Sequence, residues 1–192
     1  MPEAAVDHAQ GMQTLTIGPA QGSLTLQTGV EGRAAKAGHA LTILLTDWSA
    51  TVTLDGPQPT ALSLRTALAS LEVVSGEGGL KPLSDKDKRT VKASALQTLS
   101  AADHPEVTFA SRSIAAREDG YDVEGEVVLA GVAAPLGVGL KVHRAGGTAI
   151  VEALVPMVQT QFGIKPYTGL MGGLRVRDRV EIRLSVTVGD PA

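Results

Sequence analysis

The sequence has no cysteine and few aromatic residues, which excludes thiol chemistry and a large core filled by aromatic rings. Without cysteine the chain forms no disulfide and offers no thiol nucleophile. Only 3% of its 192 residues are aromatic, so bulky rings cannot fill a large core. No run of about 18 apolar residues occurs, and no membrane-spanning helix is expected. The net charge of −3 predicts no general attraction to nucleic acid or to an anionic membrane surface.

The first residues of the chain differ in character from the rest. Residues 1–12 contain two acidic residues, no basic residue and no apolar stretch of a secretory signal. They predict a flexible lead-in, and with it a cytoplasmic location. Residues 13–190 fit a single globular domain, and we allow for a homodimer. The composition, 43% hydrophobic and 19% charged, is that of a folded chain rather than a disordered one.

Alternation of apolar and polar residues runs through most of the chain. Residues 121–129 (YDVEGEVVL) and 179–188 (RVEIRLSVTV) show it most clearly, and about nine segments show it in some form. A period of two is typical of half-buried strands. Because most of these segments follow one another without helices between them, we expect an antiparallel sheet, either a barrel or a sandwich.

One segment has the pattern of a helix instead. Ser84 with Asp87 three residues later predicts a capping box at its start. An apolar stripe follows at four-residue spacing, made of Val91, Ala95 and Leu99. His104-Pro105 ends the pattern, since the residue before a proline disfavours helix. A second short helix is expected within residues 31–38.

The chain shows no pattern of a catalytic or metal site. The four histidines do not have metal-ligand spacing, and no nucleophile elbow is present. The basic cluster of Lys81, Lys86, Lys88, Arg89 and Lys92 contains acidic residues and no aromatic residue, which favours a solvated helix face over a nucleic-acid site. We therefore expect no enzymatic activity, no catalytic residue, no metal and no cofactor.

An apolar connection precedes the last strand, and two isolated polar residues accompany it. Pro166 and several glycines keep this connection from continuing as a strand. Its apolar residues either cover the opening of a hollow barrel or plug the end of a solid one. Asp178 falls on the apolar side of the last strand, and His39 lies at a junction between helix and strand. Each is read as a structural hydrogen-bond partner or, alternatively, as a polar contact at the mouth of a cavity.

The order of four short motifs resembles the YceI-like family, bacterial lipocalin-like proteins that bind polyisoprenoids. The motifs are HPEVTFAS at 104–111, VEGEVVLAGVAAPL at 123–136, Phe162-Gly163-Ile164, and the last strand with Asp178 and Val180. The resemblance covers roughly residues 13–188. It implies an all-β fold, an extended eight-stranded antiparallel lipocalin-like barrel with one or two short helices and an apolar tunnel.

The resemblance also implies a function without catalysis. We expect the barrel interior to bind, transport or sequester an amphiphilic isoprenoid lipid, such as a polyprenyl chain or a quinone tail. The alternative is a filled barrel that serves as a protein-interaction module without a lipid. The candidate ligand-binding residues are Val107, Phe109, Tyr121, Val123, Val127, Leu129, Phe162, Ile164, Leu170, Met171, Val180 and Ile182, with Asp178 and His39 as polar candidates near the mouth.

Overall fold

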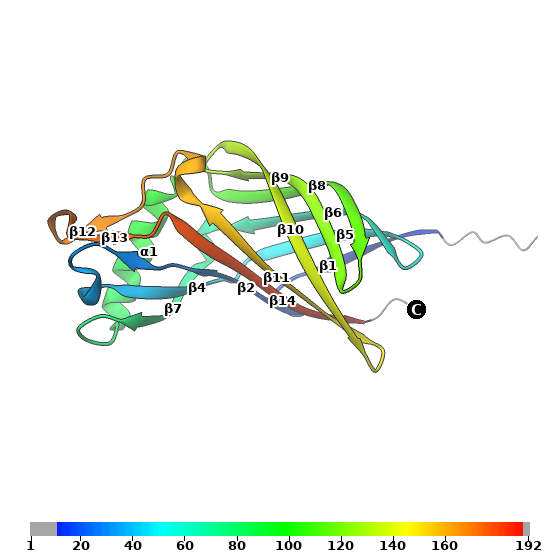
Figure 1. Ribbon diagram of the computed structural model, residues 1–192, viewed down its shortest axis with the longest axis horizontal. Helices are drawn as coiled ribbons and strands as arrows, with labels where there is room; N and C mark the ends of the chain where they lie inside the picture. Colours follow the sequence, from blue (N-terminus) through cyan, green and yellow to red (C-terminus); the bar gives the residue numbers. More distant parts are fainter. Residues whose placement is uncertain (1–10, 190–192) are drawn as a thin grey trace, which may run out of the picture.

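The structure is a computed structural model that describes residues 11–189, and antiparallel strands make up most of it (Figure 1). The main sheet consists of β1 (Met12–Ile17), β2 (Gly22–Gln27), β4 (His39–Leu45), β5 (Trp48–Asp55), β6 (Gln58–Ala67), β7 (Leu71–Gly78), β8 (Glu106–Arg117), β9 (Gly120–Leu129), β10 (Val132–Ala145), β11 (Thr148–Val158) and β14 (Arg179–Gly189). In a smaller sheet, β13 (Leu174–Val176) pairs with both β12 (Thr168–Gly169) and β3 (Val30–Glu31). The described range also contains the helix α1 (Asp85–Thr98) and four short 3-10 segments, η1 (Ala35–Ala37), η2 (Leu68–Ser70), η3 (Gln159–Phe162) and η4 (Leu170–Gly172).

The eleven strands of the main sheet amount to eight long strands, because three of the long strands are bent. Residues 18–21 separate β1 from β2, only Thr46 and Asp47 separate β4 from β5, and only η2 separates β6 from β7. β1 pairs with β5 while β2 pairs with β4, and β6 pairs with β5 while β7 pairs with β4. Each bent strand therefore keeps the same neighbour on both of its halves.

These pairings lead around a ring of strands. From β6 the order continues through β8, β9, β10, β11 and β14, and β14 pairs with β2 again. The all-β antiparallel fold expected from the sequence is confirmed, although the eight expected strands occur as eleven segments. The ring is incomplete beside β1 and beside β7, which each have one strand neighbour in this sheet.

The helix α1 covers the gap beside β7 and begins where the sequence predicted. Ser84 Oγ accepts a hydrogen bond from the Asp87 backbone amide, and the Asp87 carboxylate accepts one from the Ser84 amide, which completes the capping box. The apolar stripe of α1 packs against the buried core of the barrel. The expected second helix is only the 3-10 turn η1. The expected lead-in lies outside the described residues except for Gly11 and Met12, and Met12 already belongs to β1.

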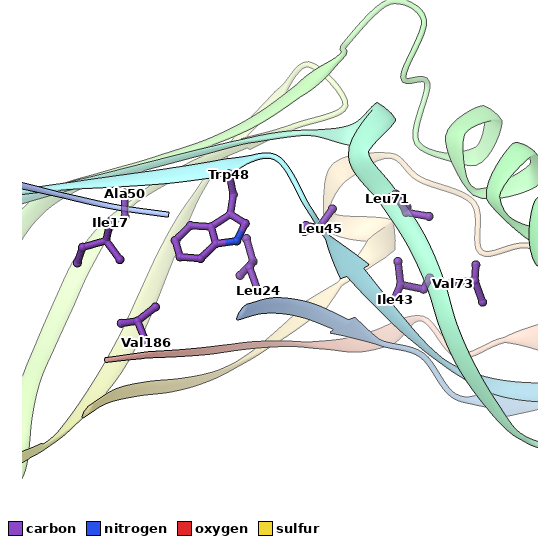
Figure 2. Close-up of a cluster of buried hydrophobic side chains, with 9 residues drawn as sticks. All are labelled: Ile17, Leu24, Ile43, Leu45, Trp48, Ala50, Leu71, Val73 and Val186. Atoms are coloured by element: carbon purple, nitrogen blue, oxygen red, sulfur yellow. The ribbon is translucent and has the colours of Figure 1, made fainter. Parts of the chain in front are cut away.

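The core consists of two apolar clusters inside the barrel. Figure 2 shows the first, formed by Ile17, Leu24, Ile43, Leu45, Trp48, Ala50, Leu71, Val73 and Val186. The second is formed by Phe109, Val123, Val127, Phe162 and Ile164. The indole of Trp48 is 2% exposed and lies near Ile17 and Leu24, away from α1. Its Nε1 has no hydrogen-bond partner among residues 11–189, so packing alone holds the ring.

None of the helices in residues 11–189 combines the length and the apolar character needed to cross a membrane.

Candidate functional site

A cavity of about 440 Å³ lies inside the barrel, between the two core clusters and α1. Its wall is drawn from strands on all sides of the ring and from one face of the helix. Leu24 and Ile43 contribute from β2 and β4, Val123 and Val127 from β9, and Ile182 from β14. The volume falls within the range of about 300–1,000 Å³ that is usual for ligand pockets.

The cavity exists because aliphatic side chains do not reach across the barrel. Eight strands leave an interior that side chains can just fill, or that can hold one small ligand. Most of the inward-facing residues are Val, Leu, Ile and Ala, and the Trp48 ring does not belong to the cavity wall. Phe109 and Phe162 are the large rings in the buried part of the wall, and both pack against the barrel in the second cluster. The scarcity of aromatic residues thus leaves space at the centre.

Polar groups in the wall gather toward one end. Thr90, Ser94 and Thr98 line the cavity from α1, and His39, Gln159 and Tyr167 line it near the smaller sheet. Deeper in the barrel, the hydroxyl of Thr66 is already used, because it donates to the Asp47 carbonyl at 3.0 Å. Thr108 on β8 also lines the cavity but is exposed to solvent, so the depth of the cavity is mainly apolar and most of its hydroxyl and amide groups lie toward the α1 end.

The structure brings ten of the fourteen candidate residues into the cavity wall. These are Val107, Phe109, Val123, Val127, Leu129, Phe162, Ile164, Val180, Ile182 and His39. For the seven that lie on β8, β9 and β14, the inward orientation follows from the period-two alternation of the strand, which places every second side chain inside. Contact of these residues with a ligand remains a prediction.

Four candidate residues lie outside the wall. Tyr121 packs against the second core cluster without reaching the cavity. Leu170 and Met171 are 60% and 107% exposed, so the expectation that they fold back over the opening is corrected. Both have left-handed backbone angles, with φ of 48° and 51°, which turn the loop outward from the barrel end. The fourth, Asp178, is engaged elsewhere.

Asp178 belongs to the bend before β14 and holds η3 in place. Its carboxylate accepts hydrogen bonds from the Thr160 backbone amide at 2.9 Å and from the Thr160 hydroxyl at 2.6 Å. Both hydrogen bonds hold the pKa of Asp178 below its ordinary value, and the one from the Thr160 hydroxyl contributes most. Of the two readings of this residue, the geometry matches the structural partner of a backbone amide.

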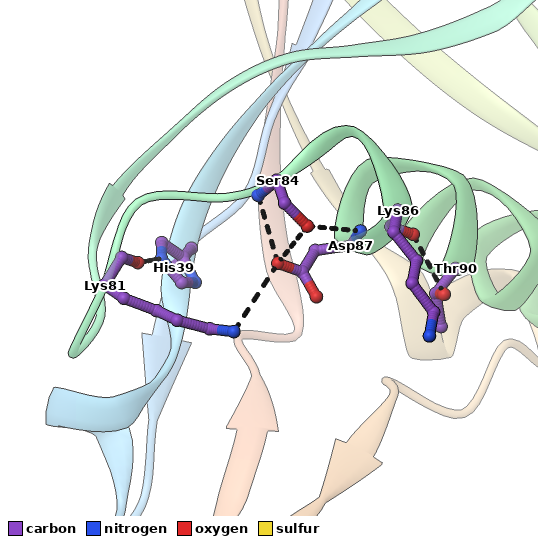
Figure 3. Close-up of polar contacts among 6 residues, drawn as sticks. All are labelled: His39, Lys81, Ser84, Lys86, Asp87 and Thr90. Carbon is purple, nitrogen blue, oxygen red and sulfur yellow. Dashed lines mark hydrogen bonds and ion pairs between the residues drawn. The ribbon is translucent and has the colours of Figure 1, made fainter.

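His39 begins β4 and combines a structural bond with a place in the cavity wall. Its Nε2 lies 2.8 Å from the Lys81 carbonyl oxygen, which ties the loop before α1 to β4 (Figure 3). Lys81 in turn approaches the Asp87 carboxylate at 4.0 Å, next to the capping box of α1. The imidazole is thus fixed at the polar end of the cavity, as the sequence-based reading of a structural hydrogen bond expected.

Sequence reasoning missed much of the wall, most of it contributed by the first half of the chain. The missed residues include Leu24, Leu26, Leu41, Ile43, Leu62, Leu64, Leu71, Met157 and the hydroxyl residues of α1. Alternation in residues 22–27 and 39–45 was a usable signal for the leucines. The helix residues gave no such signal, because the face of α1 that turns inward depends on how the helix docks.

No group of three or more histidine or acidic residues in the described part of the chain is arranged to hold a metal ion.

A curled antiparallel barrel with an apolar interior and a covering helix defines the class of protein, and comparison with known proteins identifies the family. The model of the YceI-like domain matches residues 15–188, so the chain belongs to the YceI-like family. The resemblance seen in the sequence motifs is thereby confirmed. No curated protein matches the sequence.

Solved structures share the fold at low sequence identity. BcnA from Burkholderia cenocepacia superposes with a TM-score of 0.61 at 18% identity, covering 86% of this chain and 96% of that one. The YCEI protein of Campylobacter jejuni superposes with a TM-score of 0.59 at 13% identity, covering 78% and 85%. A mutant of the latter, described with a monobromobimane guest, matches equally well at 14% identity. At these identities the likeness establishes the fold and nothing finer.

Proposed function

We propose that the protein binds and carries an amphiphilic isoprenoid lipid, with the tail inside the barrel and no catalytic step. The single observation that supports this most strongly is the largely apolar cavity of about 440 Å³ with most of its polar groups toward one end. An amphiphile has the same division, because its tail is apolar and its headgroup is polar. A polar metabolite would lose its hydration in the depth of this cavity without gaining hydrogen bonds.

The gain from burying such a tail is large enough for useful affinity. Each methylene group moved from water into an apolar cavity contributes about 0.8 kcal/mol, so ten contribute roughly 8 kcal/mol before the cost of ordering the chain. The alternative, an interaction module with a filled barrel, requires a packed interior. The cavity argues against that premise, and chemical analysis of the purified protein decides between the two.

The test is to purify the protein under native conditions, extract it with organic solvent and analyse the extract by mass spectrometry. We expect an isoprenoid lipid in near-stoichiometric amount. Phe109→Arg should abolish its recovery, because the guanidinium would lie in the apolar cavity wall. Ala110→Arg is the matched control, since residue 110 is the next on β8 and is exposed.

Two results would overturn the proposal. One is a wild-type extract without lipid together with failure of the protein to bind added polyprenyl alcohols. The other is undiminished lipid recovery from folded Phe109→Arg. If that variant does not fold, the cavity-filling variant Ala153→Phe takes its place.

A further inference from the structure

We propose that the end of the barrel at α1 and the smaller sheet docks on the surface of an anionic phospholipid bilayer. This goes beyond lipid binding in the cavity and is carried by different residues. Three features of this end support it: exposed apolar side chains on two loops, a concentration of positive charge, and the position of the cavity opening between them.

The exposed apolar side chains sit on neighbouring loops at one end of the molecule. Leu80 is 84% exposed on the loop between β7 and α1, and Leu170 and Met171 are 60% and 107% exposed on the loop between β12 and β13. Tyr167, just before β12, is 46% exposed. Both loops lie at the left end of the barrel in Figure 1, opposite the described chain ends. Exposed apolar residues that gather in this way mark an interaction surface.

A continuous set of contacts joins the two loops through η1 and β4. The Ala34 backbone amide donates to the Gly173 carbonyl at 2.8 Å, next to η4. His39, at the start of β4, then bonds the Lys81 carbonyl, next to Leu80. The exposed apolar side chains of the two loops are therefore held on one connected surface.

The backbone of the second loop places its apolar residues outward at a cost. Leu170 and Met171 both have φ near 50°, a left-handed conformation that large side chains rarely adopt. This conformation is disfavoured for residues other than glycine, asparagine and aspartate. In water, neither the strained backbone of these two residues nor the exposure of their apolar side chains stabilises the folded protein. Insertion of these side chains into the interfacial region of a bilayer would give the conformation a function.

The segments that build this end of the barrel are basic although the whole chain is acidic. Residues 30–40, 76–92 and 159–180 contain eleven lysines and arginines against five aspartates and glutamates, a formal charge of +6 in a chain of net charge −3. The remainder of the chain therefore carries −9. The net charge that predicted no attraction to an anionic membrane conceals this polarity. Basic residues beside inserted apolar ones are the combination that binds anionic lipid surfaces.

The opening of the cavity lies on the same surface. Three wall residues are also exposed, and two of them, Thr90 of α1 and Tyr167, lie at this end while Thr108 lies on β8; we therefore place an opening of the cavity at Thr90 and Tyr167. Docking in this orientation would bring the opening to the lipid headgroups. A tail could then pass between bilayer and barrel with little exposure to water.

The test is co-sedimentation of the full chain with vesicles at low salt. One set contains equal parts of phosphatidylglycerol and phosphatidylcholine, and the other contains phosphatidylcholine alone. We expect binding to the first set and little to the second, with weakening as salt screens the charges. The double variant Leu170→Asp and Met171→Asp should weaken binding by at least tenfold. Aspartate tolerates left-handed φ better than leucine or methionine, so this variant should fold.

Matched controls separate docking from general stickiness. The double variant Ile150→Asp and Leu154→Asp changes exposed apolar residues on β11, outside the docking end, and should bind vesicles as the wild type does. Lys81→Glu should weaken binding more than fivefold, since each basic residue near an anionic surface contributes about fivefold. Lys141→Glu, on β10, should not.

The outcomes distinguish this proposal from the proposed lipid cargo. Absence of wild-type binding to the anionic vesicles, or equal weakening by the β11 variant and the loop variant, overturns docking. Neither result affects recovery of extracted lipid, which tests the cavity alone. Conversely, vesicle binding by a protein that yields no lipid would keep the docking surface and reject the carrier function.

Discussion

Replacing Ala153 by phenylalanine tests the cavity most directly. Ala153 lies on β11, is 9% exposed and lines the cavity. It stands between Leu140 on β10 and Leu184 on β14, which also line the cavity. A phenyl ring at this position would therefore extend into empty space rather than into packed atoms.

The size of the effect follows from the volume. A benzene ring occupies a cavity of about 150 Å³, which is about a third of the 440 Å³ here. If a tail of about ten buried methylene groups loses three of them, the loss is about 2.4 kcal/mol, or roughly 50-fold in affinity. The free energy of unfolding should stay level or rise, because the ring fills a void.

The assay uses protein refolded from denaturant, which removes bound lipid, and titrates it with geranylgeraniol in competition with a fluorescent fatty acid. Leu154→Phe is the matched control, since it introduces the same ring at the next residue of β11, which is 53% exposed. We expect affinity to fall only for Ala153→Phe. Equal affinities of the folded variant and the wild type would refute the reasoning, because the ligand would then lie elsewhere.

Three further substitutions test packing and polar contacts outside the cavity centre. Gly125→Ala places a Cβ 2.6 Å from Phe109 Cζ, so β8 and β9 must shift, and urea unfolding should report a loss of about 1–3 kcal/mol. Ser84→Ala removes the capping hydroxyl of α1 and should cost about 1 kcal/mol in the same assay. Thr160→Val removes a hydrogen bond that lowers the pKa of Asp178, so NMR titration should find that pKa raised toward its ordinary value of 3.8. Because the folded-state pKa is lowered, the stability from Asp178 is full above pH 3.8 and is lost as the pH falls through the folded-state value. The variant should show less of this acid-dependent loss.

Each of these substitutions has a conservative control. Gly189→Ala meets nothing within 4 Å and should change stability by less than about 0.5 kcal/mol. Ser84→Thr keeps the hydroxyl that accepts from the Asp87 amide and donates to the Asp87 carboxylate, and Thr160→Ser keeps the Thr160 hydroxyl, so both should behave as the wild type. Equal effects of a substitution and its control would contradict the contact on which that prediction depends.

Local patterns in the sequence predicted much of the fold. Alternation in residues 121–129 and 179–188 indicated strands with one inward face, and most of that face lines the cavity. Ser84 and Asp87 predicted the start of α1, because a capping box depends only on residues three apart. The order of four motifs indicated the family. The shortage of aromatic residues led to the hollow interior, since interior volume depends on side-chain size more than on arrangement.

The sequence by itself thus determined the strands, the start of the helix and the lack of bulk to fill the barrel, because these depend on neighbouring residues or on composition. Only the tertiary structure decided where isolated residues lie. Asp178 fits the apolar series of its strand but turns out to bind Thr160, and Leu170 and Met171 point outward from a left-handed turn. The gathering of positive charge at one end was equally invisible, because three segments distant in sequence meet there only when the barrel closes.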